Sequence, residues 1–169
     1  MLSPKMQESL NNQLNAELFS SYLYLSMAAH LEGASLPGMA TWMRLQAQEE
    51  LSHALKFYDF IGERNGRVLL TQIEAPKTEW SGALEVFEDA YQHEQKVTHL
   101  INELANLARE EKDHATETFL QWFITEQVEE EASVSTIVDR LTLIGGNGGA
   151  LFMMDGQLGQ RPAPTAAAE

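Results

Sequence analysis

The chain has 169 residues, enough for a single domain with a sizeable core. Its 25 acidic and 11 basic residues give a formal net charge of −14, which argues against nucleic acid and membranes as partners and favours cations. The chain contains no cysteine, so disulfides and thiolate-held metal sites are excluded. Any bound metal must therefore be held by oxygen and nitrogen atoms.

Breaker residues divide the chain into four long helical segments, at about 5–32, 37–64, 82–111 and 114–144. A shorter apolar helix is expected at about 149–158, after a glycine run. Together these segments form one domain over residues 1–160, and residues 161–169 are expected to be a mobile tail. No segment has the apolar run of a signal peptide or membrane span, which favours a cytoplasmic location.

The segment lengths and connections predict an all-α fold. Helices of nearly 30 residues would be roughly 40 Å long, a length that suits a bundle. Short connections make the first and second helices, and the third and fourth, antiparallel hairpins. The connection between the second and third helices is long enough to cross the whole bundle. The predicted fold is therefore a four-helix bundle with one long crossover and a short fifth helix at the C-terminus.

Each long segment carries an apolar stripe at helical spacing, and each stripe is interrupted near its middle. The interrupting residues are Glu17 in the first segment, Glu50 and His53 in the second, Glu94 in the third, and Gln127 and Glu130 in the fourth. All of them fall near mid-bundle. Because buried carboxylates are costly without compensation, their meeting at one level predicts bound cations.

The pattern matches the ligands of di-iron and di-manganese carboxylate bundles, which take one Glu from each of two helices and a Glu-x-x-His from each of the other two. Here Glu17 and Glu94 are the single glutamates, and the second helix carries an intact Glu-x-x-His. The fourth helix instead has Gln127 followed by Glu130 at the histidine position. One metal position should therefore bind more weakly and exchange more readily.

Further carboxylates stand beside this central face. Glu49, Glu126 and Glu129 could join Glu130 in an all-oxygen site suited to a hard cation. Tyr24 lies on the same stripe as the first glutamate. Its spacing leaves two interpretations open: Tyr24 is a core residue only, or it also bonds a ligand or takes part in electron transfer.

Specific stretches surround these residues: "NAELFSSYLY", "QEELSHALKFYDF", "YQHEQ", "FLQWFITEQVEEE" and "GGALFMMDGQL". In them the chain closely resembles the bacterial non-haem ferritins, over nearly its whole length. The resemblance implies a homo-oligomeric shell of 24 subunits with a ferroxidase centre. Such a shell oxidises Fe(II) with O2 or H2O2 and stores the product as a ferric oxyhydroxide mineral.

The resemblance also implies roles for individual residues. One iron would be held by Glu17, Glu50 and His53, and a second by Glu50, Glu94 and Glu130. A third iron would be held by Glu49, Glu126, Glu129 and Glu130. Gln127 and Tyr24 would lie close to these ions.

Two positions and the absence of cysteine qualify the resemblance. Gln46 stands where histidine is expected in "HAxEE", which affects the surroundings of the ligands. Leu51 stands where the bacterioferritins carry their haem-binding methionine, so no haem is expected. A rubrerythrin-like peroxidase would need a cysteine-held iron, which this chain cannot build.

Two other functions stay open on the sequence alone. The chain could be a storage subunit whose mineral forms on an acidic surface, with little part played by the centre. It could also be a di-iron or di-manganese oxidase or peroxidase of the ferritin-like superfamily without a storage role. A fast, saturable oxidation phase and the mass of the assembly would separate these from a ferroxidase.

Overall fold

The computed structural model describes residues 1–163, and this range contains helices and no strands. The helices are α1 (Pro4–Gly33), α2 (Pro37–Glu63), α3 (Ala83–Glu110), α4 (His114–Ile144) and α5 (Gly148–Leu158). Each helix end lies within one residue of its predicted position. Within the described range, no helix combines the length and apolar character needed to cross a bilayer.

Local sequence fixes where several helices begin. Ser3 Oγ accepts a hydrogen bond of 3.0 Å from the Met6 amide, and Pro4 occupies the first position of α1. Asp113 and Asn147 cap α4 and α5 in the same way. These side chains satisfy amide groups that a helix leaves free at its first turn.

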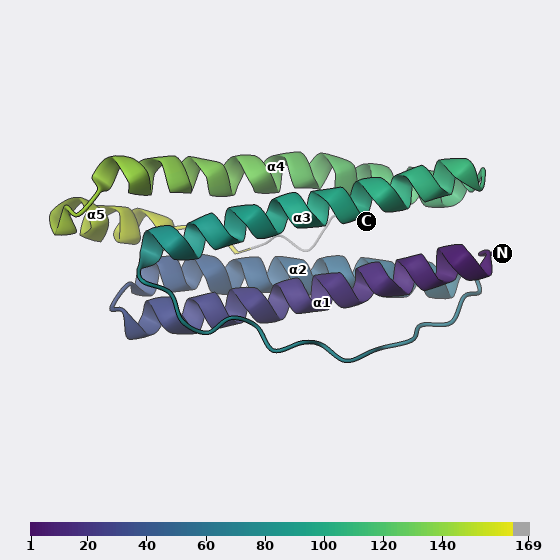
Figure 1. Cartoon of the computed structure of the whole chain (residues 1–169), viewed down its shortest axis with the longest axis horizontal. Helices are drawn as coiled ribbons and strands as arrows, with labels where there is room; N and C mark the ends of the chain where they lie inside the picture. Colours follow the sequence, from purple (N-terminus) through teal and green to yellow (C-terminus); the bar gives the residue numbers. More distant parts are fainter. Residues whose placement is uncertain (164–169) are drawn as a thin grey trace.

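The long helices form two antiparallel pairs, α1 with α2 and α3 with α4 (Figure 1). The pairs lie against each other along their length, with contacts between α1 and α3. The connection over 64–82 runs along the outside of the bundle to its opposite end (Figure 1). This is the predicted four-helix bundle with one long crossover, and the predicted fold class is confirmed.

Side chains of α1 hold the crossover in place. Asn11 is buried, donates to the Arg67 carbonyl oxygen at 3.0 Å and accepts from the Leu69 amide at 2.7 Å. Further along, Ser26 Oγ donates to the Lys77 carbonyl oxygen at 2.7 Å. These side chains bond to backbone N–H and C=O groups that neighbouring backbone would satisfy in a helix or strand. The crossover is therefore held in place without regular secondary structure.

The apolar core is split into two clusters. One lies toward the α5 end and includes Tyr24, Met27, Trp42, Phe87 and Val134. The other lies toward the opposite end and includes Leu10, Leu14, Phe57, Ile101 and Phe123. Between the clusters, all four long helices bury polar residues at one level, and we call this level the polar layer: Glu17, Gln46, Glu50, His53, Glu94, Gln127 and Glu130.

The short helix α5 is anchored to the start of α2 by Asp155. Its carboxylate accepts from the Gly38 amide at 3.1 Å and from the Met39 amide at 2.8 Å. Leu36, which precedes α2, provides no side-chain cap. Asp155 therefore caps α2 from a distant part of the chain.

Replacing Gly38 with alanine should push α5 away from α2, because the new Cβ would lie 1.9 Å from the Asp155 carbonyl oxygen. We expect a loss of about 1–3 kcal/mol in the free energy of unfolding, as in other overpacked sites. Denaturant unfolding measures this loss. Gly62→Ala is the matched control in the same helix, since nothing lies within 4 Å of its Cβ. Equal stability of the two variants would contradict the close approach.

Candidate metal centre

The polar layer contains four carboxylates and an imidazole that are almost inaccessible to water. Glu17, Glu50, Glu94 and Glu130 come from the four long helices, and none is more than 5% exposed. His53 is 3% exposed. The interruptions of the four stripes therefore meet inside the bundle, as the helical spacing indicates.

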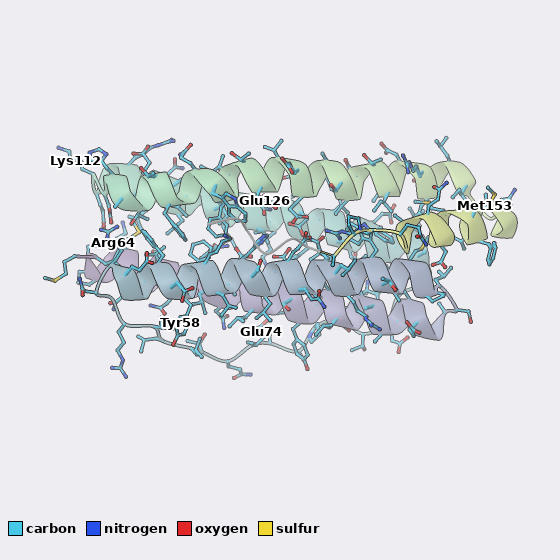
Figure 2. The ribbon with its side chains drawn as sticks, turned by 180° about the vertical axis from the view of Figure 1, so that it is seen from behind. Tyr58, Arg64, Glu74, Lys112, Glu126 and Met153 are labelled. Carbon is cyan, nitrogen blue, oxygen red and sulfur yellow. The ribbon has the colours of Figure 1, made fainter. Side chains whose placement is uncertain are left out.

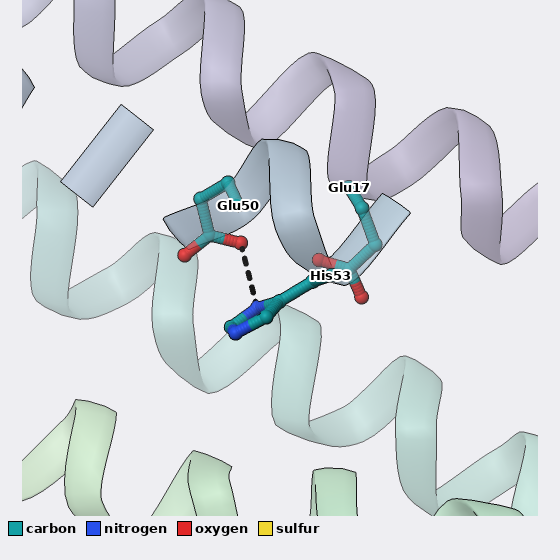
Figure 3. A group of neighbouring side chains, drawn as sticks. All are labelled: Glu17, Glu50 and His53. Atoms are coloured by element: carbon teal, nitrogen blue, oxygen red, sulfur yellow. Dashed lines mark ion pairs between the residues drawn. The ribbon is translucent and has the colours of Figure 1, made fainter. Parts of the chain in front are cut away.

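Glu17, Glu50 and His53 form the tightest cluster. Each offers a ligand atom, and these atoms lie within 4.8 Å of one another. Figure 3 shows Glu17 approaching from α1 toward the pair from α2, in which His53 Nδ1 lies 3.5 Å from Glu50 Oε2. Gln13 donates to Glu17 Oε1 at 2.8 Å. The second oxygen, Oε2, is buried without a hydrogen-bond partner among the described residues.

A second cluster joins His53 to α4. Its ligand atoms come from His53, Glu126 and Glu130 and also lie within 4.8 Å of one another. Glu126 is half-buried and lies near the middle of the bundle's length (Figure 2). The sequence pattern predicts a site for Glu126 among other carboxylates only, and its approach to the imidazole is seen in the structure.

Glu94 is held by two neighbours. The Tyr24 hydroxyl donates to Glu94 Oε1, and Gln127 Nε2 donates to Glu94 Oε2 at 3.1 Å. Tyr24 is fully buried, so it is a core residue and a partner of a candidate ligand at once. In the described part of the chain, neither three-residue cluster includes Glu94.

Gln46 connects the two sides of the layer. It is fully buried, and its Nε2 donates to Glu50 Oε1 at 3.1 Å and to Glu130 Oε2 at 2.7 Å. Its Oε1 accepts from Arg161 Nη1 at 2.8 Å. In the sequence Gln46 is a departure from the family pattern with no predicted partner, and the structure provides three.

Glu49 and Glu129 lie nearer the surface. Glu49 is half-buried and pairs with Arg161, and Glu129 is exposed. Arg161 belongs to the segment that was predicted to be a mobile tail, yet it is held against α2. Residues 164–169 of that predicted tail lie outside the described residues.

The aromatic surroundings of His53 were not predicted as part of the site. Trp122 and Phe123 meet the imidazole edge-on, with ring centroids at 5.3 Å and 5.9 Å. Their position on α4 could have been read from the stripe, because both precede Glu130 by two turns. These contacts fix the orientation of the ring.

Burial dominates the electrostatics of the layer. Burial raises the pKa of Glu17 well above its ordinary value, and the nearby Glu50 carboxylate raises it further. Burial also raises the pKa of Glu50 well above its ordinary value, and the Glu94 carboxylate adds to this effect. The pKa of Glu94 is raised by burial against the lowering effect of its hydrogen bonds from Tyr24 and Gln127. Burial, followed by Glu50 and Glu94, raises the pKa of Glu130 to about 9.

The donor set fits a divalent metal ion. It offers carboxylate oxygens and one imidazole nitrogen, a combination that suits iron, manganese and zinc. The unpartnered Glu17 oxygen is a buried acceptor facing the same cluster. A cation would satisfy this oxygen and offset the repulsion among the carboxylates.

Comparison with known proteins shows the family of the chain. The family profile described as "Ferritin-like domain" matches residues 7–144, more than half of the chain. The chain belongs to the ferritin-like family. It is 44% identical to a "Bacterial non-heme ferritin" of Bacteroides fragilis over 161 residues, covering 95% of this chain and 100% of that protein. It is 43% identical to a protein of the same name from Staphylococcus saprophyticus, covering 95% and 96%.

Solved ferritin structures share the fold over nearly the whole chain. An engineered closed form of the Archaeoglobus fulgidus ferritin superimposes with a TM-score of 0.96 at 51% identity, covering 97% of this chain and 100% of that one. An open-pore ferritin from the same archaeon gives a TM-score of 0.95 at 52% identity, covering 95% and 98%. The resemblance to ferritins found in the sequence is confirmed.

Proposed function

We propose that this ferritin-family chain stores iron and acts as a ferroxidase, with the polar layer as its ferroxidase centre. The observation that carries the proposal is the meeting of four buried carboxylates and His53 at one level of the bundle. Fe(II) is the substrate. Two Fe(II) each give one electron to O2, which becomes H2O2, or to H2O2, which becomes two water molecules, and each reduction takes up two protons. The resulting Fe(III) leaves the centre and reacts with water, releasing protons, to form ferric oxyhydroxide mineral.

We assign one Fe(II) to Glu17, Glu50 and His53, and a second to Glu50, Glu94 and Glu130. Glu50 would bridge the two positions. Since burial raises the pKa of each of these carboxyl groups, the empty centre holds protons that Fe(II) must displace. Carboxylates then stabilise the higher charge of Fe(III), because anionic oxygen is a hard ligand.

The outer carboxylates are proposed to receive iron after oxidation. Glu49, Glu126, Glu129 and Glu130 would form this third position, which we call the outer position. Gln127 replaces a charged ligand on α4, so iron near it should exchange more readily. This gives the oxidised ion a route from the buried layer toward the surface.

Stopped-flow oxidation tests the proposal. With increasing Fe(II), a working centre gives a fast phase that saturates at two Fe(II) per chain. A rate that rises in proportion to Fe(II) without saturation would contradict the centre and favour mineral growth on an acidic surface.

Tyr24→Phe tests the hydrogen bond to Glu94. Loss of the hydroxyl should leave Glu94 less firmly oriented and slow the fast phase about tenfold, as when other partners of metal ligands are removed. Tyr58→Phe is the control, since Tyr58 is 46% exposed. Identical oxidation rates for Tyr24→Phe and the parent protein would contradict a role for the hydroxyl.

A shell of 24 copies is proposed for the assembled protein. Large apolar side chains are exposed on the crossover and on α5: Leu69, Leu70, Phe152 and Met153. Exposed apolar groups of this size are typical of protein interfaces. Size-exclusion mass tests the assembly, and a monomer or dimer would favour the alternative of an oxidase or peroxidase without a storage role.

A further inference from the structure

The segment after α5 returns to the middle of α2. We call residues 159–163 the C-terminal segment. Arg161 Nη1 donates to Gln46 Oε1 at 2.8 Å, and Arg161 Nη2 donates to Glu49 Oε2. The guanidinium carbon also lies 4.4 Å from the centre of the Trp42 ring. Arg161 thus contacts three residues on one face of α2, spaced one turn apart.

The contacts suit a guanidinium in particular. It stays charged at all working pH values, donates in a planar fork and stacks on aromatic rings. The side chains of Arg161 and Glu49 are 20% and 23% exposed, so water screens the pair only in part. Arg161 therefore holds a permanent positive charge beside the Glu49 carboxylate.

Glu49 is also one of the carboxylates of the outer position. Its charge raises the pKa of Glu50, Glu126 and Glu130, though in each case burial has the larger effect. Glu49 therefore lies within electrostatic reach of the groups on α4. A metal ion held between Glu49 and α4 would need the same carboxylate that Arg161 now occupies.

We propose that Arg161 is a tethered cation that competes with a metal ion for Glu49, so that filling the outer position releases the C-terminal segment from α2. The inference rests on the proposed function, since it assumes that the outer position binds metal. Arg161 would keep this position weaker than the inner positions, so that it fills after them. It would also hold the Gln46 oxygen, which leaves the Gln46 amide hydrogens facing Glu50 and Glu130.

Calorimetric titration of the assembled protein with Mn(II) tests the competition, because Mn(II) binds the same donors without rapid oxidation. Arg161→Ala should bind a third equivalent about tenfold more tightly than the parent, whereas the first two equivalents should stay tight and change by less than this, because Arg161 reaches them only through Gln46. Arg161→Lys keeps the charge but loses the planar fork and the stacking on Trp42, so its third equivalent should bind with an affinity between those of the parent and Arg161→Ala. Arg140→Ala is the charge-matched control, since Arg140 is exposed further along α4.

Hydrogen exchange of the peptide covering the C-terminal segment gives a second readout. In the parent protein its exchange should speed up when the third Mn(II) equivalent binds. In Arg161→Ala it should be fast before any metal is added.

The outcomes separate the two claims. If Arg161→Ala and the parent both bind two Mn(II) tightly and bind the third with equal affinity, the competition is overturned and the proposed centre stands. If hydrogen exchange of the C-terminal segment stays unchanged when the third Mn(II) binds to the parent protein, the proposed release of the segment is overturned. If neither protein binds two Mn(II) tightly, the proposed centre itself is contradicted, and the competition with it.

Discussion

Replacing Glu50 and His53 together with alanine is expected to abolish the fast phase of Fe(II) oxidation, lowering the initial rate by about a hundredfold or more. Glu50 is placed in both proposed iron positions, and His53 provides the only nitrogen ligand in either three-residue cluster of the described chain. Removing both leaves neither position with enough ligands. Stopped-flow absorbance at two Fe(II) per chain measures the loss.

The fold should survive this change, because the two apolar clusters on either side of the polar layer are left intact. Circular dichroism should show the parental helix content. His99→Ala with Glu103→Ala is the matched control, since it removes one exposed histidine and one exposed glutamate from α3. A parental oxidation rate in the Glu50/His53 variant would contradict the assignment.

The metal-free protein is expected to lose stability as the pH rises from about 7 to about 9. Four carboxyl groups of the polar layer have raised pKa values, and that of Glu130 rises from 4.5 to about 9. In this window the folded chain keeps protons that the unfolded chain has released. The stabilising contribution of Glu130 is therefore complete below pH 4.5 and is lost as the pH rises through about 9.

Thermal unfolding in the presence of a chelator measures this loss, expected as a fall of a few degrees or more in Tm. Burial and Lys96 lower the pKa of His93 to about 4 from its ordinary value of 6.5. This histidine therefore makes the folded chain more stable as the pH rises from about 4 to 6.5, and its effect is constant at higher pH. The window above pH 7 therefore isolates the carboxyl groups. Glu130→Gln should flatten the dependence, and a Tm that rises between pH 7 and pH 9 would contradict the account.

Mn(II) should reverse the loss, because metal binding needs the carboxylates without their protons. The rise in Tm on adding Mn(II) should be larger at pH 9 than at pH 7. Equal rises at the two pH values would mean that the layer binds metal without releasing protons.

Much of the fold could be predicted because long amphipathic helices leave a clear pattern. The stripes gave each helix a buried face, and Gly, Pro and capping residues marked their ends. The level of Glu17, Glu50, Glu94 and Glu130 followed from helix rise alone, since mid-helix positions meet whichever way each helix runs.

The contacts made by the C-terminal part could not be predicted in the same way. Asp155 and Arg161 act on α2 across more than a hundred residues of sequence. Periodicity reports which face of a helix is buried, but it carries no information on where the chain goes after a helix ends. The orientation of the Gln46 amide depends on its hydrogen bond from Arg161, so this orientation could not be predicted either.

The grouping of the outer carboxylates was limited by side-chain length. Glu126 and Glu129 are neighbours on α4, and the sequence placed both beside the central face. Glu126 reaches inward to His53, whereas Glu129 is exposed. Flexible side chains of this length can turn either way from the same helix position.

Anomalous diffraction from crystals soaked in Fe(II) without oxygen tests the central claim most directly. The account predicts one iron peak between Glu17, Glu50 and His53, and a second between Glu50, Glu94 and Glu130. Iron confined to the surface of the bundle, with no peak in the polar layer, would contradict it.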